Sequence, residues 1–176
     1  MSTPPPPVLA NGQPPANARD LLDRLGSLGI ESTTVSHPPV FTVEEARAHR
    51  DGAPGAYTKN LFLRDKKGVM WLVVAIESQS VDLRALAESL GHKRFSFGSP
   101  ERLMRYLGVI PGAVTPFAVM NDHEGVVQVA LDMALRDHDV WNFHPLDNAM
   151  TTTLLAKDML RFLEAVDHTP RWVAFE

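Results

Sequence analysis

The chain has 176 residues, of which 44% are hydrophobic, and a formal net charge of −4. This length suits a single domain with one well-filled core. The absence of cysteine excludes disulfides, a thiolate nucleophile and a thiolate zinc site. The acidic balance argues against a broad phosphate-binding face and against DNA binding. Short basic clusters at 66–67, 92–94 and 102–105 leave room for small phosphate contacts, although such clusters are usually solvated surface.

The longest apolar stretch, 69–76, has only the length of a strand, so we expect no membrane contact. The N-terminus lacks the charged start and apolar core of a secretory signal, and the expected location is the cytoplasm. Residues 1–16 contain Pro4–Pro7 and Pro14–Pro15 among small polar residues. This composition predicts an extended, proline-rich tail, followed by one domain over 17–176.

Helix and strand signals alternate in the first part of the domain. Asn17 is placed to cap a helix with an apolar face of leucines, and Gly29 to end it. Thr42 and Glu45, three residues apart, predict a capping box at a second helix. In chain order, the expected elements are a helix over 17–29, a strand over 33–35, a helix from 42, a Gly- and Pro-rich loop over 51–56 and a strand over 57–64.

A tight turn is expected to join that strand to the next one. In Asp65-Lys66-Lys67-Gly68, the glycine can supply the positive φ angle of a hairpin turn. The following stretch, 69–76, is apolar on both faces, which predicts a central strand. A helix over 81–90 and a strand over 94–97 follow.

The second half opens with Ser99 and Pro100, which predict the start of a helix that ends at Gly108. Two glycines and two prolines in 108–116 predict a stiff loop. The elements expected after it are strands over 117–121 and 126–131 paired as a hairpin, strands over 140–143 and 151–155, a helix over 158–166 and a strand over 171–175. Without regular β-α-β alternation, these elements indicate an α+β domain with a mixed, curved sheet of about seven strands flanked by helices.

Several common kinds of site lack their sequence signals. No two of the seven histidines stand four residues apart on a predicted helix, and Asp137-His138-Asp139 lies in a predicted turn, so we expect no metal. A Gly-x-Ser-x-Gly elbow, a Walker loop and a dinucleotide fingerprint are also absent, and no cofactor is expected.

Polar residues remain at the expected ends of strands. Lys59 and Asn60 open an apolar strand, and Arg94 and His144 stand at the ends of two others. Each residue alone also fits a structural role, as a surface lysine or a turn histidine before proline. Backbone N–H groups of the stiff loop could polarise a carbonyl or hold an oxyanion. Together they would suit hydrolysis of an acyl group by a positioned water, without a protein nucleophile.

Side-chain alternation separates the first two of these residues. In a regular strand, Lys59 and Asn60 point to opposite faces. We therefore expect Lys59 to contact a ligand, and Asn60 to hold a loop or a pocket wall.

Five ordered stretches resemble the freestanding prolyl-tRNA editing proteins, which share the fold of the editing domain inserted in bacterial prolyl-tRNA synthetase. The resemblance extends over about residues 18–176 and leaves out only the proline-rich tail. The stretches are His37-Pro-Pro-Val-Phe-Thr-Val-Glu-Glu-Ala46, Thr58-Lys-Asn-Leu-Phe-Leu-Arg-Asp-Lys-Lys-Gly68, 93–103, Leu107-Gly-Val-Ile-Pro-Gly-Ala-Val-Thr-Pro-Phe117 and Val140-Trp-Asn-Phe-His-Pro-Leu146.

The resemblance implies cleavage of the ester that joins a wrong amino acid to tRNA for proline, and it is greatest to the branch that removes alanine. It implies assistance from the 2′-hydroxyl of the terminal adenosine, and no metal. Mischarged tRNA would be the partner, with prolyl-tRNA synthetase as a second candidate. The implied roles are Lys59 as the functional lysine, Asn60 at the pocket, Gly112 and Pro116 as the frame of a loop whose amides hold the aminoacyl end, His144 lining the site and Arg94, with Lys59, at the acceptor end of the tRNA.

Substrate size explains why such an enzyme is needed. A synthetic site shaped for proline cannot strongly reject alanine, because lost methylenes are worth only about 1–3 kcal/mol, and a second pocket too small for proline can correct the error. Phe143 and Leu61 are candidates for the wall of that pocket, although Phe143 also suits a plain core position. Two alternatives remain open: the same chemistry on Cys- or Ser-charged tRNA, and a non-catalytic module that binds tRNA or a synthetase.

Overall fold

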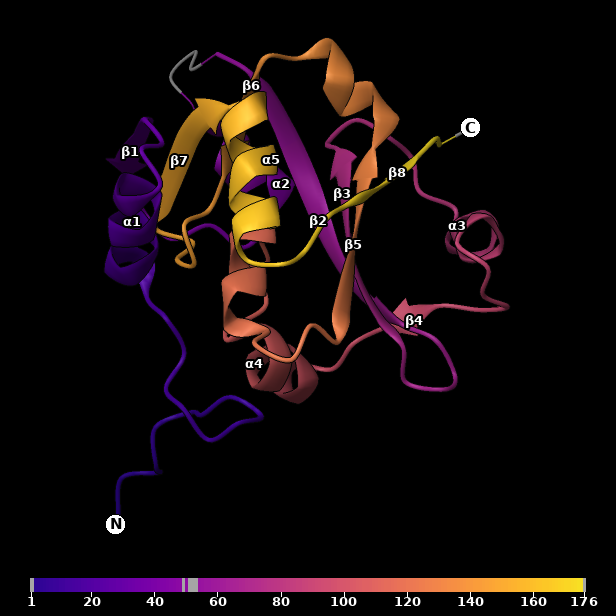
Figure 1. Cartoon of the computed structure of the whole chain (residues 1–176), viewed down its shortest axis with the longest axis horizontal. Coiled ribbons are helices and arrows are strands. Elements are labelled where there is room, and N and C mark those ends of the chain that lie inside the picture. The colour runs from indigo at the N-terminus through magenta and orange to yellow at the C-terminus, as the bar shows by residue number, and fades with distance from the viewer. Residues whose placement is uncertain (1, 49, 51–53, 176) are drawn as a thin grey trace.

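One mixed sheet organises the protein, whose computed structural model describes residues 2–48, 50 and 54–175. Eight strands lie in it in the order β1-β7-β6-β2-β3-β5-β8, and β4 pairs with β2 (Figure 1). The predicted α+β class and mixed sheet are confirmed, with one strand more than expected.

Apart from two 3-10 helices, η1 and η2, the elements follow the predicted order with small shifts of their ends. They are α1 (Ala18–Ser27), β1 (Ser32–Ser36), α2 (Val43–Ala48), β2 (Ala56–Arg64), β3 (Met70–Ile76), α3 (Leu83–Ser89), β4 (Ser96–Phe97), α4 (Pro100–Leu107), the 3-10 helix η1 (Pro116–Asn121), β5 (Val127–Asp132), the 3-10 helix η2 (Met133–Asp137), β6 (Val140–Phe143), β7 (Met150–Leu155), α5 (Ala156–Ala165) and β8 (Arg171–Val173).

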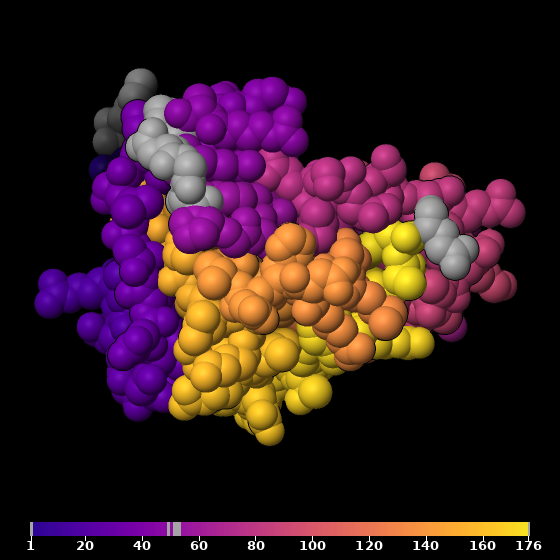
Figure 2. Space-filling model, turned by 90° about the horizontal axis from the view of Figure 1, so that it is seen from above, coloured from indigo at the N-terminus to yellow at the C-terminus, as the bar shows by residue number. Residues whose placement is uncertain are grey.

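The central strands divide the apolar core into two layers. β3 is buried on both faces, as predicted. Its even-numbered residues join a large cluster with the apolar sides of α1, α4, η1 and α5, and Trp71 and Val73 join a smaller cluster with α3. Figure 2, seen from above, shows α1 (indigo) and the segment around α3 (magenta) on opposite sides of the molecule.

Strand β2 has different neighbours at its two ends. It pairs with β3 in antiparallel fashion from Thr58 to Arg64, but with β6, in parallel, only at Ala56 and Tyr57. β4 occupies the same outer edge at Leu63 and Arg64. The Phe62 carbonyl also accepts from the Gly98 N–H, at 2.9 Å, so the outer edge of β2 is open between Tyr57 and Phe62, and the candidate site lies at this opening.

The predicted hairpin of 117–121 with 126–131 is wrong, because the first segment is the 3-10 helix η1. The Thr115 hydroxyl caps this helix by accepting from the Phe117 N–H at 3.3 Å. Asn121 fixes its other end, since its side chain donates to the Leu107 carbonyl at 2.9 Å. β5 instead lies between β3 and β8, parallel to both.

The proline-rich segment contains neither helix nor strand over the described residues 2–16. Its second half nevertheless packs on the domain. Leu9 is buried, and the Ala10 N–H donates to the Arg105 carbonyl at 2.8 Å. Among the described residues, no helix has the length and apolarity needed to cross a membrane.

Candidate functional site

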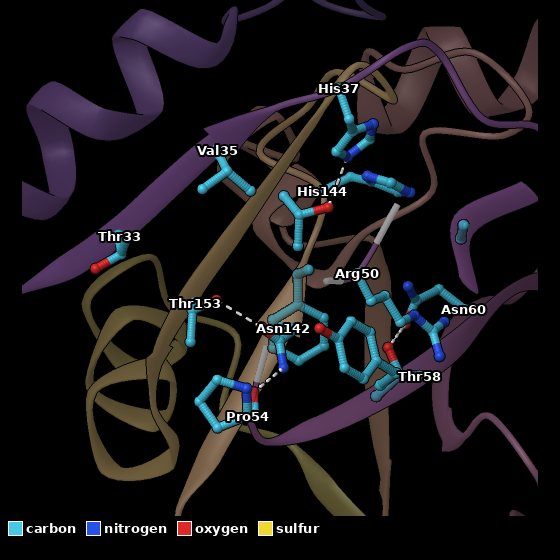
Figure 3. Close-up of a pocket in the computed structure, with 14 residues that line it drawn as sticks. Thr33, Val35, His37, Arg50, Pro54, Thr58, Asn60, Asn142, His144 and Thr153 are labelled. Atoms are coloured by element: carbon cyan, nitrogen blue, oxygen red, sulfur yellow. Dashed lines mark hydrogen bonds between the residues drawn. The ribbon is translucent and has the colours of Figure 1, made fainter. Parts of the chain in front are cut away.

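A cavity of about 290 Å³ lies where β2 separates from β6. Residues of β1, β6 and β7 form one wall, and the start of β2 forms another (Figure 3). The floor is a row of register partners across four strands. In order, the row is Thr33, Thr153, Asn142 and Tyr57.

Asn142 fixes the entrance of the chain into β2. Its buried side-chain amide donates to the carbonyls of Pro54 and Ala56, at 2.9 and 3.2 Å, and its oxygen accepts from the Thr153 hydroxyl. The close fit requires a glycine at position 55, where φ is +100° and a Cβ atom would lie 2.6 Å from the Val140 carbonyl oxygen. Sequence reasoning missed Asn142 as a site residue, because the two carbonyls lie 88 and 86 positions away.

His144 contributes a neutral imidazole to the cavity. Its Nδ1 lies 2.7 Å from the Met150 carbonyl oxygen. A carbonyl can only accept, so the geometry assigns the proton to Nδ1 and leaves a lone pair on Nε2. Burial lowers the pKa of His144 below its usual 6.5. No residue in the described part of the chain bonds to Nε2, and this nitrogen is available as a base.

His37 stands beside it, with the two ring centroids 6.1 Å apart. Its Nδ1 lies 2.9 Å from the Pro38 carbonyl, and its Nε2 lies 2.8 Å from the Thr151 hydroxyl. In its neutral form His37 therefore donates through Nδ1 and accepts the Thr151 proton at Nε2. The sequence signals gave His37 no role, since it lies 107 positions before His144 and precedes a proline.

Asn60 lines the cavity and holds the stiff loop against it. Its side-chain amide donates to the Val114 carbonyl at 3.0 Å, and its oxygen accepts from the Thr58 hydroxyl at 3.2 Å. Burial of Thr115 and Pro116 also holds the C-terminal end of the loop in place. This contact joins the 112–116 loop to the cavity wall.

Within that loop, Gly112 adopts a left-handed conformation with φ +92°. A Cβ atom there would lie 3.1 Å from the Phe41 ring. Among the described residues, the N–H groups of Gly112 and Val114 have no acceptor. Gly112, Val114 and Pro116 do not line the cavity themselves; the loop is joined to it through the bond from Asn60 to the Val114 carbonyl.

Phe143 has both of the roles that its sequence position suggested. It lines the cavity and is also buried in the large core cluster, in edge contact with Phe117 at 5.8 Å between ring centroids. Leu61 does not line the cavity; it packs against the smaller core cluster. Thus Phe143 can limit the size of a ligand, but Leu61 cannot.

Lys59 is half-buried and lies outside the cavity lining. It shares a strand face with Tyr57, one row further along β2, and its partner on β3 is Ala75. The described residues offer it no ion pair. Lys59 is therefore a cation next to the site rather than a group within it.

Arg94 is not brought to the cavity. It is exposed and precedes β4, which pairs with the far end of β2. The rise of a strand, about 3.3 Å per residue, puts this end roughly 20 Å from Tyr57. Arg94 therefore does not line the cavity, and its expected contact with the acceptor end of the tRNA stays a prediction.

Arg50 is a cavity residue that the sequence did not indicate. Its guanidinium stacks on the Tyr57 ring at 3.8 Å and pairs with Glu77, Nη2 to Oε2, at 2.5 Å. Its Nε is buried and has no partner in the described part of the chain. A ligand oxygen would satisfy this donor. Its partners Tyr57 and Glu77 lie in two other segments of the chain, so no local sequence motif indicates Arg50 as a site residue.

The groups present suit acyl chemistry. A neutral imidazole nitrogen and a guanidinium line one cavity, and Asn60 joins the 112–116 loop to its wall. Over the residues described, no three His, Asp or Glu side chains are arranged to hold a metal ion.

Comparison with known proteins agrees with the motifs. Residues 37–162 match the family model of the aminoacyl-tRNA editing domain. The prolyl-tRNA editing protein ProX of Acetoanaerobium sticklandii is 37% identical over 150 residues, which cover 85% of this chain and 92% of that protein. The prolyl-tRNA synthetase associated domain-containing protein 1 of Danio rerio is 38% identical over 160 residues, which cover 90% of this chain and 87% of that protein.

Solved structures show the same fold. A crystal structure described as that of a candidate trans-editing enzyme for prolyl-tRNA synthetase has a TM-score of 0.71 at 19% identity, and covers 90% of this chain and 96% of its own. The resemblance inferred from the five stretches is thereby confirmed. With a family model over most of its length and relatives above 35% identity, the chain belongs to the aminoacyl-tRNA editing domain family.

Proposed function

We propose that this protein is a trans-editing hydrolase that removes alanine from mischarged tRNA for proline. The family supports the editing reaction, and the names of the relatives support the proline system. The observation that carries the chemistry is the Nε2 of His144, which bonds to no described residue and lies in a cavity that Asn60 also lines. Such a reaction belongs where charged tRNA is used, in the cytoplasm.

The first step activates water. The ester carbonyl accepts hydrogen bonds from the N–H groups of Gly112 and Val114, which polarise it. His144 Nε2 takes a proton from a water molecule as the water oxygen attacks the carbonyl carbon. The loop amides hold the negative charge that forms on the carbonyl oxygen.

The second step breaks the ester. The tetrahedral intermediate collapses, the bond from carbon to the ribose 3′-oxygen breaks, and the His144 imidazolium returns its proton to that oxygen. The neighbouring 2′-hydroxyl assists by donating a hydrogen bond to the same leaving oxygen. Alanine and a tRNA with a free 3′ end are the products, and no covalent enzyme intermediate is needed.

Two cations have roles in binding. Arg50 offers its buried Nε, which has no partner among the described residues, to an oxygen of the terminal nucleotide. Its pairing with Glu77 holds the guanidinium in place. Lys59, one row beyond Tyr57, neutralises phosphate at the rim. Arg94, which precedes β4 at the far end of β2, takes part in neither of these two contacts.

The size of the cavity, which Phe143 limits on one side, determines which amino acid the enzyme accepts. Phe143 is buried against Phe117 and cannot move aside without disturbing the core. A fixed wall tolerates a methyl group more readily than a pyrrolidine ring. Cysteine and serine are close to alanine in size, and they are the main competing substrates.

A panel of charged tRNAs tests the proposal. Alanyl-, cysteinyl-, seryl- and prolyl-tRNA for proline are incubated in parallel with the protein and with a control deacylase. The proposal expects the fastest loss of alanine and no loss of proline. A faster loss of cysteine or serine would change the substrate, and four intact substrates would favour a non-catalytic module that binds tRNA or a synthetase.

A further inference from the structure

The C-terminal end of α4 is held by the segment that begins the chain. A helix leaves its last four carbonyl groups without partners inside the helix, so other groups must satisfy them. In α4, the Arg105 carbonyl accepts from the Ala10 N–H at 2.8 Å. The Leu107 carbonyl accepts from the Asn121 side chain at 2.9 Å. A residue from the start of the chain thus helps to cap a helix in its second half.

Residues 9–16, which we call the N-terminal strap, lie beside α4 (Figure 1). The strap is fixed at both of its ends. Leu9 is only 3% exposed, and the Ala16 N–H donates to the Asn121 side-chain oxygen at 2.9 Å. A tight turn lies between these ends, since the Leu9 N–H donates to the Gln13 carbonyl and the Leu9 carbonyl accepts from the Gly12 N–H, both at 2.9 Å. The strap is therefore an ordered part of the fold.

The strap also packs on Gly108, the first residue of the stiff loop. Gly108 has a left-handed φ of +68°, and a Cβ atom there would lie 2.7 Å from Pro15 Cβ and 2.5 Å from Asn121 Nδ2. Asn121 joins all three segments, because its oxygen binds the strap and its amide binds the end of α4. The strap, α4 and η1 thus meet where the loop begins.

The 108–116 loop is held at three places. The strap packs on its start at Gly108, and Asn60, which lines the cavity, binds the Val114 carbonyl. Burial of Pro116 holds its end. If the start of the loop moved, the N–H group of Gly112 would move relative to the cavity wall. Donors that stabilise a developing charge must be accurately placed, and an error of about 1 Å can cost a hundredfold in rate.

We propose that the N-terminal strap is a positioning element of the editing reaction. It fixes the start of the loop whose amides polarise the ester carbonyl in the reaction proposed above, and the inference rests on that proposed function. None of the strap residues lines the cavity, so the strap acts through Gly108 and the loop and not by contact with the substrate.

The test releases the strap by one buried charge. Leu9→Asp places a carboxylate in an apolar position, where it is costly. Leu9 belongs to neither core cluster of the described residues, so the core should remain intact. Val8→Asp is the matched control, because Val8 is the adjacent residue and is 51% exposed. Measured by mass spectrometry, hydrogen exchange of the 108–116 amides should be roughly tenfold faster in Leu9→Asp and unchanged in Val8→Asp.

Single-turnover deacylation of alanyl-tRNA for proline gives the functional result. Leu9→Asp should lower the rate constant roughly tenfold, and Leu9→Met, which fills the same space, should retain it. Leu9→Ala leaves only a space; it should have a smaller effect of the same kind, and it provides the test if the charged variant does not fold. Gly125→Ala controls for lost stability, because its strain arises away from the loop, and its rate should be unchanged.

Three outcomes separate the two proposals. Equal exchange of the loop amides in the Leu9 and Val8 variants would overturn the positioning role. Faster exchange with an unchanged deacylation rate would overturn it too. A protein that hydrolyses none of the charged tRNAs would overturn the editing function, and the exchange experiment would still decide whether the strap fixes the loop.

Discussion

The imidazole of His144 donates from Nδ1 to the Met150 carbonyl at 2.7 Å. This bond connects the end of β6 to the start of β7 and orients the ring. It also fixes which nitrogen faces the cavity. The direction of the bond thus makes Nε2 the base of the proposed reaction.

Replacing His144 by alanine should lower kcat for deacylation by about 10²–10⁴-fold, the usual contribution of a general base. The exposed histidine of the turn before β5 provides the control, because His123→Ala should leave the rate unchanged. Single-turnover assays on alanyl-tRNA measure both. Equal rates for the two variants would remove His144 from the mechanism.

The pH dependence of kcat/KM should reflect the lowered pKa of His144. The base works only when Nε2 is unprotonated, so the rate should rise with pH and level off. Because burial lowers the pKa, the midpoint of the rise should lie below 6.5. A midpoint above 6.5 would contradict a buried neutral base.

Gly112→Ala should show whether the 112–116 loop contributes to deacylation as well as to the stability of the fold. The left-handed φ of +92° makes alanine cost about 1–2 kcal/mol, and its Cβ would press on Phe41. Gly125 has a similar φ of +67° with open space around it, so Gly125→Ala is a matched control. Both variants should lose comparable unfolding free energy in urea, but only Gly112→Ala should lose deacylation. Equal activity of the two would argue against loop amides in the reaction.

Sequence patterns predicted most of the fold because the decisive signals are local. Asn17 caps α1 through its own N3 position, and Gly68 turns the hairpin with φ +89°. The prediction for 117–121 failed because its apolar run suits a buried strand as well as a buried 3-10 helix. The distinction depends on Asn121, whose partner Leu107 is 14 residues away.

The site was predictable only in part for the same reason. Motifs placed Asn60, Phe143 and His144, and the structure brings all three to one cavity. Arg50 is held at the cavity by its ion pair with Glu77, and Asn142 by its hydrogen bond to the Pro54 carbonyl. Both partners are distant in sequence, so no local motif indicates these contacts. Arg94 matched a motif, yet the pairing of β4 with the end of β2 moves it away.

Arg50→Lys should weaken substrate binding while the fold survives. Lysine retains a positive charge for Glu77 but loses Nε and the planar group that stacks on Tyr57. We expect KM for alanyl-tRNA to rise roughly tenfold with little change in kcat, because the proposed contact is to the terminal nucleotide and would be made before the reaction. Arg84→Lys, on the exposed face of α3, is the control. A fall in kcat alone would give Arg50 a different role.

The buried pair of His168 and Asp122 should make stability depend on pH. The Nε2 of His168 lies 2.8 Å from Asp122 Oδ2, and its Nδ1 lies 2.6 Å from the Val166 carbonyl. Both ring nitrogens therefore donate, which requires the charged imidazolium. Burial alone would lower the pKa of His168, but the hydrogen bonds to Asp122 and Val166 outweigh it and raise the pKa above 6.5.

A raised folded-state pKa gives stability that is complete below the unfolded value of 6.5 and is lost as pH rises through the folded value. The urea midpoint should therefore fall as the pH rises above 6.5. His168→Gln keeps a neutral donor for Asp122 and should remove this part of the slope, while His138→Gln, on an exposed residue, should retain it. If the slope is the same in His168→Gln as in the unaltered protein, the imidazolium is not the origin of the pH dependence.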